Sequence, residues 1–162
     1  MDQEGTGRPA RRTGAQAAAR HMRELDRDEA LRLLATVSLG RIVFTQQALP
    51  AVRPVNHLVD GEDVIIRIHE GGALAALAAP VDAPGVVVAY EADAIDPVTY
   101  LGWSVVVTGY ACPVTDAAEA DRYASLLRPW VGQPMTAALR IRPDLVTGFR
   151  LEADRAVRFA SH

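Results

Sequence analysis

The sequence predicts a mainly β protein with short helices, in which about six strands run antiparallel. Three observations predict this class. Short runs rich in β-branched residues recur along the chain, separated by turn formers. The dipeptide Asp60-Gly61 lies between two such runs and is typical of a tight hairpin turn. Two other segments, which begin at Asp26 and Asp116, have the capping residues and apolar spacing of helices.

The strands follow from alternation and composition. The run 86–89 is continuously apolar, as in a strand that is covered on both faces. Pro50 and Pro54 lie near the start of the second strand, and a proline in a strand belongs at an edge, at a bulge or where a ligand approaches. The six expected strands are 40–45, 51–59, 64–68, 85–93, 102–114 and 138–151.

The helices are predicted from their first turns. In both of the longer ones a glutamate follows the capping aspartate by three residues, which is the capping-box spacing. The first of them is expected to run as far as Leu39. A third, short helix is expected over 73–79, between a Gly-Gly pair and Pro80. We expect all of these helices to pack against the strands.

The central hairpin places polar side chains together. If the two residues after Asp60 form the turn, Asn56 faces Arg67 and Pro54 faces His69. Asn56, Arg67 and His69 then share one face, beside the backbone N–H groups at the start of the short helix. Such a patch is a plausible anion site. The alternative is that Arg67 is an ordinary solvated arginine.

Composition limits the function classes. With 162 residues, 49% of them hydrophobic, the chain suits one globular domain. All seventeen basic residues are arginine, which excludes a lysine Schiff base. The single Cys112 excludes an internal disulfide and a cysteine-pair metal site. Glu91 and Asp93 share a strand face without a nearby histidine, so we predict no metal site.

Charge and hydropathy bear on partners and location. The net charge of the chain is −3. Residues 1–20 carry four arginines and two acidic residues, so the remaining residues carry a net charge of −5. We therefore predict a disordered basic tail over 1–22, a single domain over 23–162, and no nucleic-acid partner. No apolar run approaches the ~20 residues that span a bilayer, and the first residues lack the apolar segment expected of a signal peptide. A cytoplasmic protein without a membrane partner is expected.

Most of the chain resembles one family. The segments LGRIVF (39–44), RPVNHLVDGEDVIIR (53–67), GWSVVVTG (102–109) and RIRPDLVTGFRL (140–151) occur in the order seen in the pyridoxamine 5'-phosphate oxidase-like family of FMN-binding split barrels, in its small actinobacterial-type branch. The resemblance covers about 25–151. It implies a split β-barrel, a homodimer, FMN as cofactor, and an oxidoreductase that acts on a small organic acceptor.

The resemblance also implies the cofactor site. In the family the second strand meets the flavin, the turn after the third strand holds the flavin phosphate, and the start of the fifth strand approaches the ring, often across a dimer interface. No catalytic residue is implied. The corresponding positions here are Arg53, Pro54, Val55, Asn56, Arg67, Ile68, His69, Gly72, Ala73, Trp103 and Ser104. For Trp103 the alternative is a tryptophan of the core or of an interface.

Three of these positions depart from the family pattern. Ile68 stands where threonine is usual, Gly72 where serine is usual, and Ala73 where a basic residue is usual. A charge-assisted hydrogen bond contributes roughly 1.5 to 3 kcal/mol, so losing two weakens binding about a hundredfold. The alternative is therefore a non-catalytic module that has lost FMN and binds haem or a deazaflavin. His57 and His69 are then the candidate haem ligands.

No other catalytic motif is present. The sequence lacks a nucleophile elbow, a Walker loop, an HExxH pair and a dinucleotide-binding GxGxxG. Hydrolase, phosphotransfer and zinc-protease functions therefore have no support. A flavin protein needs no such motif, because the cofactor carries the redox chemistry.

Overall fold

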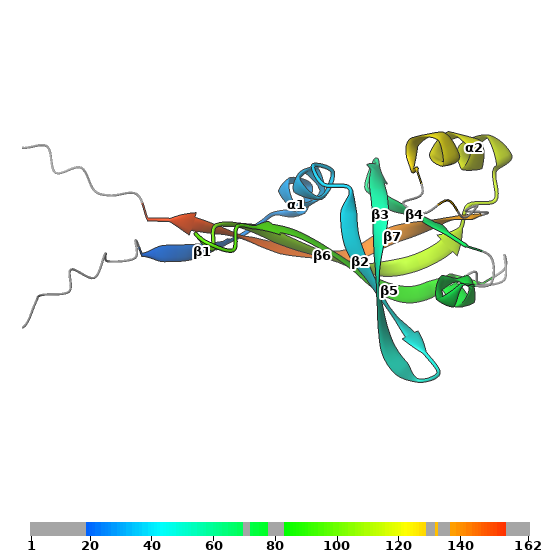
Figure 1. Cartoon of the computed structure of the whole chain (residues 1–162), viewed down its shortest axis with the longest axis horizontal. Coiled ribbons are helices and arrows are strands. Elements are labelled where there is room, and N and C mark those ends of the chain that lie inside the picture. The colour runs from blue at the N-terminus through cyan, green and yellow to red at the C-terminus, as the bar shows by residue number, and fades with distance from the viewer. Residues whose placement is uncertain (1–18, 70–71, 78–82, 129–131, 133–136, 155–162) are drawn as a thin grey trace, which may run out of the picture.

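The chain forms a β-barrel with an extra strand and two short α-helices (Figure 1). This computed structural model describes residues 19–69, 72–77, 83–128, 132 and 137–154. In these ranges the elements are β1 (Arg20–Glu24), α1 (Arg27–Leu34), β2 (Leu39–Gln46), β3 (Leu49–Asp60), β4 (Asp63–Ile68), the 3₁₀ helix η1 (Ala73–Leu77), β5 (Val86–Ile95), β6 (Gly102–Pro113), α2 (Ala117–Leu126) and β7 (Ala137–Ala153).

The strands are antiparallel and close on themselves. Their order is β1-β7-β4-β3-β2-β5-β6, and β6 also pairs with β7, so the six strands from β2 to β7 form a ring. β1 adds to β7 outside this ring. The predicted split barrel of mainly β class is confirmed, and the six predicted strands correspond to β2–β7.

The helix caps form as the sequence predicted, although the first helix is shorter. Asp26 accepts a hydrogen bond from the Glu29 backbone N–H at 2.8 Å, and Asp116 accepts the equivalent bond from Glu119 at 2.8 Å. α1 ends at Leu34 and not at Leu39. The helix ends in a turn in which Thr36 N–H donates to Leu33 O at 2.9 Å, and the chain runs alongside β3 from Ser38 onward.

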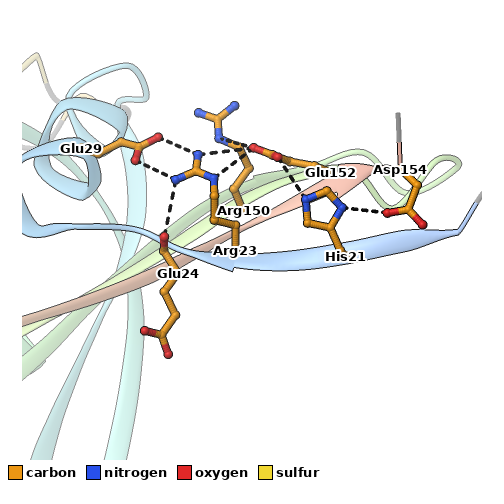
Figure 2. A network of polar contacts seen from close by, with 7 residues as sticks. All are labelled: His21, Arg23, Glu24, Glu29, Arg150, Glu152 and Asp154. Atoms are coloured by element: carbon orange, nitrogen blue, oxygen red, sulfur yellow. Dashed lines mark hydrogen bonds and ion pairs between the residues drawn. The ribbon is translucent and has the colours of Figure 1, made fainter. Parts of the chain in front are cut away.

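The predicted tail boundary at residue 22 is wrong at its last residues. Residues 20–22 belong to β1, and 1–18 lie outside the described part of the chain. Figure 2 shows what holds β1 in place: Arg23 binds Glu29 of α1 through two 3.0 Å contacts and Glu152 of β7 at 3.3 Å. In Figure 1 the ends of β1 and β7 reach beyond the barrel as an arm.

The core fills the barrel and continues beneath α1. Its fully buried members include Ile42, Val64, Tyr90 and Val107, which point inward from four different strands. A smaller cluster around Tyr123 attaches α2 to the outside of the barrel. Among the described residues, no helix is both long enough and apolar enough to cross a membrane.

Candidate functional site

The candidate site is the place where β3 and β4 separate. The predicted register is confirmed from Asp60↔Asp63 to His57↔Ile66, but the predicted pairs of Asn56 with Arg67 and of Pro54 with His69 lie outside the ladder. Beyond that pair the ladder ends, because β3 continues along β2 while β4 continues along β7. The next residues, Asn56 on β3 and Arg67 on β4, therefore lie on the two sides of an opening in the barrel wall.

This opening contains a hollow of about 280 Å³, which we call the split hollow. Its volume lies near the lower end of the ~300–1,000 Å³ typical of ligand pockets. Nine of the eleven predicted cofactor positions line it, and Leu74 was the one lining residue that we did not predict. The lining residues are Arg53, Pro54, Val55, Asn56, Arg67, Ile68, His69, Gly72, Ala73 and Leu74.

The backbone of β3 turns hydrogen-bonding groups toward the split hollow. His57 N–H donates to Ser38 O at 2.9 Å, so the backbone groups of His57 face β2. Because these directions alternate along an antiparallel strand, Val55 also faces β2, whereas Pro54 and Asn56 face the opening. The proline costs no ladder hydrogen bond, because its missing N–H is on the side that β4 has left.

The polar side chains of the split hollow also bind the end of α2. Asn56 Nδ2 donates to Arg128 O at 2.8 Å, and a guanidinium N–H of Arg67 donates to Leu127 O at 3.2 Å. Arg53 is exposed and donates to the carbonyl of Val52 at 2.8 Å. The cationic character of the hollow therefore comes from one half-buried and one exposed arginine.

The expected helix start beside the hollow is weaker than predicted. η1 is a five-residue 3₁₀ helix, Ala73–Leu77, and the rest of the predicted helix, 78–79, lies outside the described residues, as does Gly71. A helix this short supplies little macrodipole. An anion here would depend on individual N–H groups and on Arg67.

Trp103 and Ser104 do not reach the split hollow of the same chain. Trp103 is 7% exposed and belongs to the barrel core. Ser104 lines a different hollow, of about 490 Å³, on the outside of the sheet, which we call the outer hollow. Its lining residues are Met22, Glu24, Leu25, Ser104, Val106, Val146, Thr147, Gly148 and Phe149.

The two candidate haem ligands differ in their surroundings. His69 lines the split hollow, whereas His57 is 3% exposed and lies behind it. His57 Nε2–H donates to Leu34 O at 2.9 Å, and His57 Nδ1 lies 2.6 Å from the Tyr90 hydroxyl. Burial lowers the pKa of His57, which therefore stays neutral near pH 7. Both ring nitrogens are already engaged, so His57 has a structural role.

Comparison with known proteins agrees with this architecture. The chain matches the family described as pyridoxamine 5'-phosphate oxidase over residues 26–150. It is 52% identical over 147 residues to the uncharacterized protein Rv0080 of Mycobacterium tuberculosis, a match covering 90% of this chain and 96% of that protein.

Two solved structures share both the fold and about a third of the sequence. One is a putative pyridoxamine 5'-phosphate oxidase from Corynebacterium glutamicum, with 31% identity, a TM-score of 0.66, and coverage of 83% of this chain and 96% of that one. The other is a FAD-binding protein from Mycobacterium smegmatis, with 31% identity, a TM-score of 0.60, and coverage of 80% and 98%. The chain therefore belongs to the pyridoxamine 5'-phosphate oxidase family, to which its sequence motifs pointed.

Proposed function

We propose that this protein is a cytoplasmic flavin-dependent oxidoreductase that binds FMN in the split hollow and reduces or oxidises a small organic molecule. The observation that carries the proposal is the opening between β3 and β4, which gathers nine family cofactor positions around one hollow. The similar M. smegmatis protein is described as FAD-binding, which supports a flavin as the ligand.

The residues present fit a flavin. The lining is mostly apolar, which suits an aromatic ring, and the Asn56 backbone N–H faces the hollow as a donor for a ring carbonyl. Arg67 and His69, on the β4 side, can meet a phosphate. A bound flavin supplies the hydride or electron transfer. The protein's part is to bind the ring, orient it and exclude water from one face.

The alternative ligands use the same hollow. A deazaflavin would meet the same apolar lining and the same Arg67. Haem would have to use His69, since both ring nitrogens of His57 are engaged. The visible spectrum of protein purified without added cofactor distinguishes a Soret band from a flavin spectrum.

Replacing Arg67 with alanine is expected to raise the Kd for FMN about 10- to 100-fold, because one charge-assisted contact to the phosphate is lost. The Kd for riboflavin, which lacks the phosphate, should rise much less in the same variant. The measurement is quenching of flavin fluorescence during titration. Arg32→Ala, at an exposed position on α1, is the matched control and should leave both constants unchanged. Equal losses for FMN and riboflavin would contradict the proposed role of Arg67.

We also propose that the working form is a homodimer, because a single chain does not bring Ser104 to the split hollow. The outer face of the sheet offers the second copy exposed apolar side chains around the ion pair of Arg41 and Glu91. Cross-strand pairing puts Met22, Val87, Tyr110 and Leu145 on the same side as Ser104, and all four are between 41% and 66% exposed. A second copy on this face would cover the outer hollow.

Val106→Arg is expected to convert the dimer to a monomer, because it places a charge in the outer hollow, where it would be desolvated on association. Val106 is half-buried on the outer face of β6, so the longer side chain can extend into the outer hollow and the fold should survive. Sedimentation velocity measures the change. Leu126→Arg, at an exposed position on α2, is the control and should remain dimeric. An unchanged sedimentation coefficient for Val106→Arg would place the interface elsewhere.

A further inference from the structure

Tyr90 and His57 lie directly behind the split hollow, and no part of the proposed function uses them. Tyr90 is on β5, is fully buried, and reaches across β2 to His57 on β3. It can do so because Gly40 of β2 has no side chain: a Cβ there would lie 2.6 Å from Tyr90 Cζ. Tyr90 on β5 therefore contacts residues of two other strands, Gly40 on β2 and His57 on β3.

Hydrogen-bond chemistry fixes the direction of each proton. Leu34 O can only accept, so His57 Nε2 carries the proton that it donates. In neutral His57 the other nitrogen, Nδ1, is then an acceptor, and the Tyr90 hydroxyl donates to it at 2.6 Å. The same hydroxyl lies 3.3 Å from Val55 O, so its one proton is shared between this carbonyl and the closer Nδ1. Burial raises the pKa of Tyr90, so the hydroxyl keeps its proton.

The Val55 carbonyl and the Asn56 N–H belong to one planar peptide unit and point in opposite directions. Val55 O faces β2, where Gly40 is the residue paired with Val55. The Tyr90 hydroxyl is a second group that contacts this carbonyl oxygen. Holding this carbonyl toward β2 therefore holds the Asn56 N–H toward the split hollow. A rotation of the peptide would present a carbonyl oxygen to the ligand and remove the donor.

We propose that Tyr90, kept in place by His57 and admitted by Gly40, is a positioning residue that orients the Val55–Asn56 peptide so that its N–H binds the ring of the flavin. The inference rests on the proposed flavin function. It assigns ring binding to this peptide and phosphate binding to Arg67, and the two assignments can be separated by ligands that differ only in the phosphate.

The test compares Tyr90→Phe with Tyr123→Phe. Both tyrosines are fully buried, and each variant loses only a hydroxyl, but the Tyr123 hydroxyl binds Asp60 at 2.6 Å and is not against the Val55–Asn56 peptide. Tyr90→Phe is expected to raise the Kd for FMN and for riboflavin by the same factor, about tenfold. Tyr123→Phe should leave both within about twofold, whatever its effect on Tm.

Two results would overturn the positioning role if the wild-type protein binds flavin. One is an equal effect of the two variants on flavin affinity, and the other is a loss for FMN alone. If the wild-type protein binds neither flavin, the proposed function fails, and the positioning role is then decided by NMR of the ligand-free protein. A shifted or broadened Asn56 amide resonance in Tyr90→Phe but not in Tyr123→Phe supports it, and an unchanged resonance rejects it.

Discussion

Replacing Gly40 with alanine is expected to lower the free energy of unfolding by about 3 kcal/mol or more. The new Cβ would lie 2.6 Å from Tyr90 Cζ and 2.6 Å from Glu91 O, well inside van der Waals contact. The Glu91 carbonyl belongs to the backbone of β5 and cannot swing aside. Relief therefore requires β2 to shift away from the backbone of β5 and Tyr90 to move as well, which leaves the buried His57 Nδ1 without its donor.

Urea denaturation measures this loss, and Gly61→Ala is the matched control. Gly61 has φ +64 in the turn after Asp60, and a Cβ there meets nothing within 4 Å. The control therefore carries only the backbone cost of about 1 kcal/mol. A similar loss for the two variants would mean that the crowding at Gly40 relaxes freely. We also expect the double variant Gly40→Ala, Tyr90→Leu to lose less than the sum of its parts.

The features that could be predicted from the sequence are local ones. The register of β3 and β4 follows from a two-residue turn after Asp60, because in a hairpin the loop length sets every pair that follows. The split hollow follows in turn, since Pro54 lies on the part of β3 that β4 has left, and the family motif names its neighbours. The helix caps at Asp26 and Asp116 are equally local.

The features that could not be predicted depend on contacts between distant segments. β1 has no alternating apolar pattern, because all five of its residues are exposed, and Arg23 is held by Glu29 and Glu152. Trp103 was assigned to a ligand pocket by family position, but its side chain lies on the face of β6 that points into the barrel and therefore belongs to the core. The contact between Gly40, Tyr90 and His57 involves three strands, so no sequence window contains it.

The stability of the protein is expected to fall when the pH drops below about 6.5, and much of this fall should come from His57. Its pKa is lowered in the folded protein because burial disfavours the charged ring. In the unfolded chain the ring titrates near 6.5. Below that pH the unfolded state binds a proton that the folded state does not, so the free energy of unfolding decreases as pH falls, until the folded pKa is reached.

His57→Gln isolates this contribution. The amide can still donate to Leu34 O and accept from Tyr90, but it does not titrate. Between pH 6.5 and 5.5 the wild-type protein should lose up to about 1 kcal/mol relative to the variant, because the unfolded ring goes from about half to about nine-tenths protonated over this range. Urea midpoints at each pH measure the difference. The comparison is needed because burial raises the pKa of Glu91, whose protonation at falling pH favours the folded state and opposes the His57 effect.

Parallel pH profiles for the wild-type protein and His57→Gln would mean that the buried ring accepts a proton as readily as it does in water, and that the contact with Tyr90 survives as an imidazolium donating to the hydroxyl oxygen.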